Sequence, residues 1–234
     1  ARAAYSEGEW ERMRSSHVRG LLLRGITAYE RSNGKQHPLQ LGIIGSTDNH
    51  AAAGGFVEED AWLGSVFGVG DFDRRMTRRA FNPGGLVAVW AEENTRSSIF
   101  AALKRREVYA TSGPRIRAKL SASNQAIKCG EARAGLVPMG GEMNRLDSAP
   151  HFLVQAQFDR VPIQSVEIIK GEIVAGQAKE SVQQIWHDQN GGLDVCVSWQ
   201  DPDFQSESPA FWYVRVLQAP TPRWSAHDCQ REGR

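Results

Sequence analysis

Cysteine is scarce in this chain of 234 residues, and the few cysteines form no recognisable pattern. Cys129, Cys196 and Cys229 are far apart, and no two of them have the C-x-x-C spacing of structural zinc sites or redox pairs. Three widely spaced cysteines do not indicate a disulfide framework. We therefore expect the fold to depend on a hydrophobic core, which the 41% hydrophobic content can supply.

The chain also lacks long apolar runs and an excess of charge of either sign. No stretch approaches the roughly 20 apolar residues that cross a bilayer, and the first residues, ARAAYSE, contain no signal-peptide core. The balance of 28 Lys and Arg against 27 Asp and Glu gives a net charge of +1, so no basic field attracts nucleic acid or an anionic membrane. We expect a soluble globular protein with no membrane span and no nucleic-acid partner.

The beginning of the chain has neither an initiating Met nor a strand or turn before its first helical pattern. Residues 6–32 are charged and carry apolar side chains at close to 3.6-residue spacing, which predicts an amphipathic helix. We interpret the chain as a piece of a longer protein. This interpretation leaves the compartment open between periplasm and cytoplasm, and leaves the oligomeric state undetermined.

The first half of the chain alternates between strand and helix patterns. Strands are predicted over residues 41–44, 86–90 and 107–111. A helix follows the second strand, with Asn94 or Thr95 as its N-cap and a buried stripe formed by Ile99, Phe100 and Leu103. This alternation predicts α/β packing with parallel strands.

The second half of the chain contains short strand patterns separated by Gly, Pro, Asn and Asp, with no helix between them. They cover residues 117–120, 152–158, 165–170, 183–186, 193–199 and 211–217. Regularly spaced short strands of this kind predict an antiparallel, sandwich-like region. We place the boundary at 113–116 and expect two parts, residues 1–115 and residues 116–234.

The most informative motif places Asp48 and His50 two residues apart at the end of the apolar run 41–44. A carboxylate oxygen and a neutral imidazole nitrogen together suit Zn, Mn or Fe. A second interpretation is a turn in which Asp48 makes a local hydrogen bond and His50 lies at the surface. The residues by themselves leave both interpretations open.

A series of ordered motifs gives the chain a resemblance to a known family. The motifs are IIGSTDNH (43–50), EED (58–60), AVWAEENTR (88–96), KRREVYATSGPR (104–115), VPMGG (137–141), IIKG (168–171), DPDF (201–204), YVRVL (213–217) and PTPRWS (220–225). The chain resembles the C-terminal portion of the bacterial family of unknown function DUF3604, which is related to the PHP (polymerase and histidinol phosphatase) metallohydrolases. The resemblance covers nearly the whole chain.

The resemblance implies the C-terminal part of a distorted (β/α) barrel that holds two or three divalent metals, followed by a β-rich region. Asp48 and His50 match the last metal motif of PHP-like proteins, whereas the upstream His-x-His pair has no counterpart here. Two ligands do not make a catalytic metal site, which normally uses three or more. The other histidines occur without the spacing of a ligand motif, so the missing ligands are expected before Ala1.

The chemistry implied by the resemblance is hydrolysis of a phosphoester or related ester in a small-molecule substrate by metal-activated water. Glu92 and Glu93 are candidates to orient a ligand or substrate, or else interact with the positive end of the following helix dipole. Arg115 is a candidate for binding an anionic group, or else an ordinary surface residue. The alternative function is a non-catalytic module whose β-rich region binds a glycan or partner through its aromatic side chains.

Overall fold

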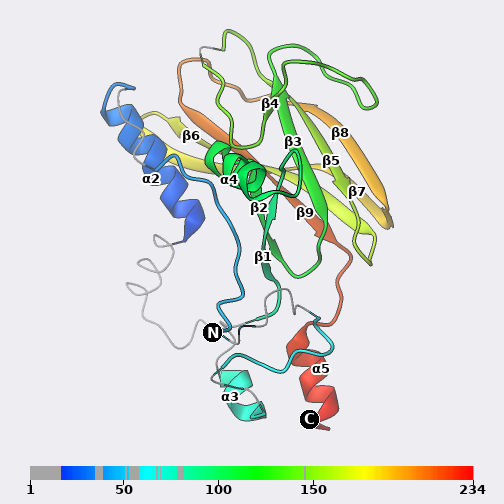
Figure 1. Ribbon diagram of the computed structural model, residues 1–234. Coiled ribbons are helices and arrows are strands. Elements are labelled where there is room, and N and C mark those ends of the chain that lie inside the picture. The colour runs from blue at the N-terminus through cyan, green and yellow to red at the C-terminus, as the bar shows by residue number, and fades with distance from the viewer. Residues whose placement is uncertain are drawn as a thin grey trace.

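The computed structural model describes residues 17–34, 39–50, 52, 58–66, 68, 70–77, 82–144 and 146–233 (Figure 1). Its helices are α2 (Val18–Arg31), α3 (Phe72–Thr77), α4 (Arg96–Arg105) and α5 (Trp224–Arg231). Its strands are β1 (Gly85–Val89), β2 (Val108–Ser112), β3 (Arg117–Ser123), β4 (Val137–Pro138), β5 (His151–Gln157), β6 (Ile163–Val174), β7 (Gln177–Gly192), β8 (Asp194–Gln200) and β9 (Ala210–Gln218). Every strand pairing between these elements is antiparallel.

Two of the three sheets form a β-sandwich. One sheet has the strand order β4-β3-β5-β8 and the other the order β7-β6-β9. Alternate residues of these strands point between the sheets, as Val154 on β5 and Val166 on β6 do, and both are fully buried in one hydrophobic cluster. Six of these seven strands overlap the six strand patterns predicted within residues 116–234, and β4 was not predicted. A sheet with one buried face favours side chains that alternate along each strand.

Helix α2 packs on strands β6 and β7 (Figure 1). Its buried side is centred on Gly25 and Ile26, and Arg19 pairs at the helix surface with Glu180 of β7. Residues 6–16 of the expected helix lie outside the described residues. In the described part of the chain, no helix is long and apolar enough to cross a membrane.

The remaining sheet, β1-β2, corrects the predicted fold class. The two strands are antiparallel, with Gly85 opposite Ser112 and Val89 opposite Val108, and no (β/α) barrel is present in the described residues. The chain leaves β1, forms α4 and returns to the same end of the pair, where the Trp90 amide donates to the Glu107 carbonyl at 2.9 Å. Parallel strands would instead need a crossover along the full strand length.

Helix α4 also differs from its predicted packing. Thr95 is its N-cap and accepts a hydrogen bond from the Ser98 amide, as predicted. The predicted buried stripe is wrong, because Phe100 is 62% exposed and Leu103 is exposed too, while Ala102 is the buried residue. A two-stranded sheet covers only a narrow strip of a helix, so the small Ala102 faces the interior and the larger apolar side chains do not.

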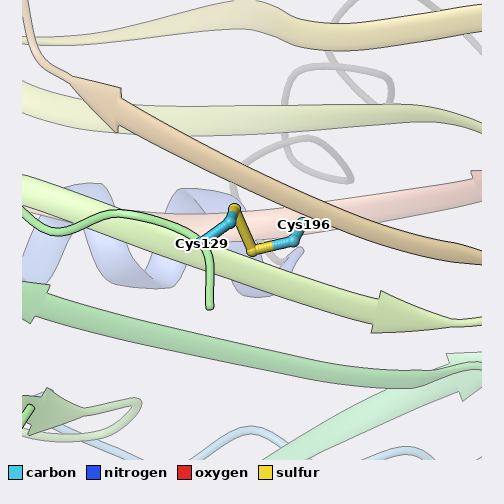
Figure 2. Close-up of a disulfide and its surroundings, with 2 residues drawn as sticks. All are labelled: Cys129 and Cys196. Atoms are coloured by element: carbon cyan, nitrogen blue, oxygen red, sulfur yellow. A yellow bond between two sulfur atoms is a disulfide. The ribbon is translucent and has the colours of Figure 1, made fainter. Parts of the chain in front are cut away.

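A disulfide joins Cys129 to Cys196 with their Cα atoms 5.9 Å apart, which corrects the expectation of a fold without disulfides (Figure 2). Cys129 lies in the connection between β3 and β4, and Cys196 lies on β8. The two are 67 residues apart in sequence. The pairing results from the sheet order, in which β3 and β8 both flank β5, and no local spacing reveals it.

Candidate functional site

The segment leading to Asp48 lies against the β1-β2 pair but does not form the predicted strand at 41–44. A Cβ atom added to Gly45 would lie 2.7 Å from the Leu86 carbonyl oxygen, and one added to Gly85 would lie 2.0 Å from the Ser46 carbonyl oxygen. The backbones therefore touch where a side chain would keep them apart. Leu41 and Ile44 are exposed, so the apolar run 41–44 does not act as a buried strand.

Asp48 and His50 project from one turn at the end of this segment. The imidazole Nδ1 of His50 lies 3.5 Å from the Asp48 carboxylate and 2.7 Å from the Asp48 carbonyl oxygen. Both side chains are accessible, at 72% for Asp48 and 56% for His50. The turn is held by two local hydrogen bonds, in which the Ser46 and Thr47 hydroxyls accept from the Asp48 and Asn49 amides.

The backbone of this turn is strained. Asp48 has φ of 53° and His50 has φ of 56°, a left-handed conformation that residues other than Gly adopt at a cost of about 1–3 kcal/mol. Such conformations persist where the surrounding structure enforces them. Here the Val66 amide donates to the Asn49 carbonyl at 2.9 Å, which fixes the turn at its centre.

The antiparallel pairing separates Glu92 and Glu93 from this turn. They follow the end of β1, whereas Ser46 touches the beginning of that strand at Gly85. Glu93 accepts a hydrogen bond from the Thr95 hydroxyl at 3.1 Å, and its amide donates to the Ser98 hydroxyl at 3.2 Å. The structure therefore places Glu93 in the cap of α4, and both acids at the far end of the β1-β2 pair.

Arg115 lies in a charged pocket at the end of the β1-β2 pair that Ser46 touches. The pocket has a volume of about 250 Å³, and its lining includes Glu58, Arg115, Arg160, Arg223 and His227. The Arg115 guanidinium lies 3.8 Å from the Glu58 carboxylate, while its backbone amide donates to Asp159 at 3.0 Å. Both groups of Arg115 are therefore held by carboxylates that line this pocket.

Helix α5 closes the same pocket. Glu59 accepts a hydrogen bond from the Trp224 amide at 2.7 Å, at the helix N-terminus, and its other oxygen lies 2.7 Å from Arg223 Nη2. Asp228, 1% exposed, pairs with Arg75 of α3 at 2.6 Å and with Arg231. Burial alone would raise the pKa of Asp228, but the hydrogen bonds from the two arginines outweigh it and lower that pKa.

Sequence reasoning missed most of this pocket. Arg160, Arg223 and His227 come from the β5-β6 connection and from the region of α5, far along the chain from Glu58. The sequence contains the EED motif at 58–60 and the RWS end of the last motif, but nothing in their spacing indicates that they lie close together in the fold. Only the fold brings them together.

The remaining candidates do not add ligands to Asp48 and His50. The described residues contain no group of three or more His, Cys, Asp or Glu that could hold a metal ion, and His37 lies outside them. Trp199 and Trp212 pack against the sandwich core, where the Trp212 indole donates to Asp201 at 3.1 Å. These two aromatic side chains therefore do not form an exposed glycan-binding face.

Comparison with known proteins gives one result. A family model described as "Protein of unknown function (DUF3604)" matches residues 2–191 and 183–234. No curated protein and no solved structure gives a significant match. Because the two matched ranges together cover nearly the entire sequence, the chain belongs to the DUF3604 family of proteins of unknown function.

Proposed function

We propose that the chain is part of a metal-dependent hydrolase in which Asp48 and His50 supply two ligands to a divalent ion, Zn, Mn or Fe. The observation that carries the proposal is the strained turn, which holds the accessible Asp48 carboxylate 3.5 Å from Nδ1 of the accessible His50 imidazole. Strain of this kind accumulates at functional sites.

The imidazole is oriented for such a role. With the proton assigned to Nδ1, that nitrogen donates to the Asp48 carbonyl at 2.7 Å, and in this tautomer the lone pair of the imidazole is on Nε2. A hydrogen bond to the nitrogen that does not bind the metal is the usual way to fix the tautomer and direction of a ligating histidine. Asp48 and His50 act as metal ligands in this proposal and are not the groups that transfer protons.

The donor set fits these metals in kind but is incomplete in number. An oxygen and a nitrogen donor suit Zn, Mn or Fe, and a catalytic site needs at least one more protein ligand. The proposal therefore requires further ligands from outside the described residues. When bound, two or three such ions would lower the pKa of coordinated water toward about 7 for hydrolysis of a phosphoester or related ester.

The proposed relationship to the PHP metallohydrolases rests on the same Asp-x-His motif and on its place among the ordered motifs of the chain. The proposed relationship concerns the metal ligands, and it does not require that the described residues form a barrel. The other proposed function, a glycan-binding or partner-binding sandwich, receives no support from Trp199 and Trp212, which pack inward. The metal-dependent function is therefore the one that we propose to test first.

The disulfide supports one of the two compartments. Disulfides form and persist in oxidising compartments such as the bacterial periplasm and are rare in the cytoplasm. The Cys129 to Cys196 pair therefore favours a periplasmic or other extracytoplasmic location.

Metal content tests the assigned ligands. A protein that extends this chain at its N-terminus, together with its Asp48→Ala and His50→Ala variants, is stripped with a chelator, reloaded with Zn, Mn or Fe(II), and assayed for bound metal and for hydrolysis of nitrophenyl phosphomonoesters and phosphodiesters. Each ligand variant should lose at least about tenfold in metal affinity. Glu92→Ala is the matched control, because Glu92 is exposed and lies at the far end of the β1-β2 pair. Equal metal content in all variants would reject the site.

A further inference from the structure

The charged pocket beside α5 already holds a carboxylate, that of Glu58. Arg160 approaches this carboxylate with both terminal nitrogens, Nη1 at 2.8 Å from Oε2 and Nη2 at 3.1 Å from Oε1. Arg115 adds a third contact at 3.8 Å. The forked, two-nitrogen approach is the geometry by which guanidinium groups recognise planar carboxylates.

The ion pairs that hold the Glu58 carboxylate are weak enough for another carboxylate to replace it. The Arg160 side chain is 69% exposed, and that of Arg115 is half exposed. Ion pairs between exposed side chains contribute little, because water screens them and the long side chains lose conformational freedom. An external carboxylate can therefore replace the Glu58 carboxylate at a small cost.

The remaining lining of the pocket defines the size and character of the ligand. Pro114, Val161 and Pro222 provide apolar walls, and the volume of about 250 Å³ admits only a small molecule. His227, half buried on α5, also lines the pocket. A short aliphatic acid fits these surroundings, with its carboxylate on the arginines and its carbon chain along the prolines and the valine.

The charged side chains that line the pocket favour a ligand with a single negative charge. Three arginines line the pocket, and so do four acids, Glu58, Glu59, Asp60 and Asp159. A phosphate dianion would bring a second negative charge close to these acids, whereas a carboxylate that displaces Glu58 replaces one negative charge with another. We therefore expect the pocket to favour a carboxylate over a phosphate dianion.

From these observations we propose that the pocket binds a small aliphatic carboxylate through Arg115 and Arg160, and that Glu58 is the internal carboxylate that this ligand displaces. Glu58 then regulates access to the site by competing for the same guanidinium groups. The site uses neither Asp48 nor His50, and it is independent of the proposed hydrolase function.

Titration with butyrate, followed by NMR of the backbone amides of Gly113 and Arg115, tests this proposal on the full chain. Removing the internal competitor with Glu58→Gln should tighten butyrate binding about fivefold, the equivalent of about 1 kcal/mol for an exposed ion pair. Arg160→Gln and Arg115→Gln should each weaken it about tenfold, since a charge-assisted contact is lost. Arg105→Gln removes an exposed arginine paired with Glu107 elsewhere and should leave binding unchanged.

Three results would overturn the proposal. They are the absence of saturable shifts in Glu58→Gln, equal butyrate affinity in all the variants, and tighter binding of inorganic phosphate than of butyrate. Thermal denaturation of each variant establishes that it is folded before titration. Asp48→Ala should bind butyrate as the unmodified chain does, so failure here is distinguishable from failure of the metal site.

Discussion

Removing the disulfide between Cys129 and Cys196 is expected to lower the free energy of unfolding by about 4 kcal/mol. The two cysteines are separated by 67 residues. A crosslink across a loop of this length withdraws about 15 cal/mol/K of conformational entropy from the unfolded chain, which gives the free-energy difference near room temperature. The effect is therefore set by where the crosslink lies along the chain.

The positions of the two cysteines make this estimate unusually direct. Both are exposed, so replacing them with serine opens no cavity and buries no hydroxyl group. The double variant Cys129→Ser with Cys196→Ser is preferable to either single change, because a single change leaves a thiol that could pair with Cys229. The loss of stability should then report mainly on the unfolded state.

Urea denaturation followed by fluorescence of the seven tryptophans measures the change. The midpoint of the double variant should fall, and dithiothreitol should lower the midpoint of the unmodified chain to the same value. Cys229→Ser is the matched control, since Cys229 is a free thiol, and should behave as the unmodified chain does. Equal midpoints for the double variant and the unmodified chain, or a lower midpoint for the double variant on adding reductant, would refute the reasoning.

Two further predictions concern the elements that position the sites. Asp228 has a lowered pKa in the folded chain, so its stabilising contribution is complete above its unfolded pKa of about 3.9 and is lost as pH falls through the folded value. Asp228→Asn should flatten the melting temperature between about pH 5 and pH 2, and an unchanged acid dependence would contradict this. Gly85→Ala should cost about 1–3 kcal/mol in urea denaturation, because the new methyl group meets the Ser46 carbonyl oxygen. Gly42→Ala, whose methyl group meets Arg106 Cγ at 3.2 Å and the Val108 side chain at 3.4 Å, is the milder comparison and should cost less than Gly85→Ala.

The strands of the sandwich could be predicted from the sequence because their signal is local. Each has one face toward the core, so apolar residues recur at every second position, as Val154 and Ala156 do on β5. The N-cap of α4 was predicted for the same reason, since Thr95 satisfies an amide only three residues away. Such features depend on neighbours along the chain and on burial of a single face.

The direction in which strands pair was not predictable on that basis. A strand, a helix and a second strand are compatible with a parallel crossover, and the pattern of residues 86–111 contains nothing that distinguishes the two outcomes. In the structure α4 ends at Arg106, which has φ of 63°, and the chain returns beside the end of β1, where the Trp90 amide donates to the Glu107 carbonyl. A left-handed arginine leaves no mark in a hydrophobic pattern, and the barrel prediction failed at this point.

That single difference in pairing has unequal effects on the predicted sites. In a parallel sheet the residues after β1 and after β2 would share an edge, whereas antiparallel pairing sends Glu92 and Arg115 to opposite ends. Asp48 and His50 lie close together whatever the pairing, because only Asn49 separates them in sequence and the turn itself holds them together. Predictions that rest on sequence neighbours thus tolerate an error in topology, and those that join distant segments do not. The pocket formed by Glu58, Arg115 and Arg160 belongs to the second kind, so its ligand has to be sought by experiment on the folded chain.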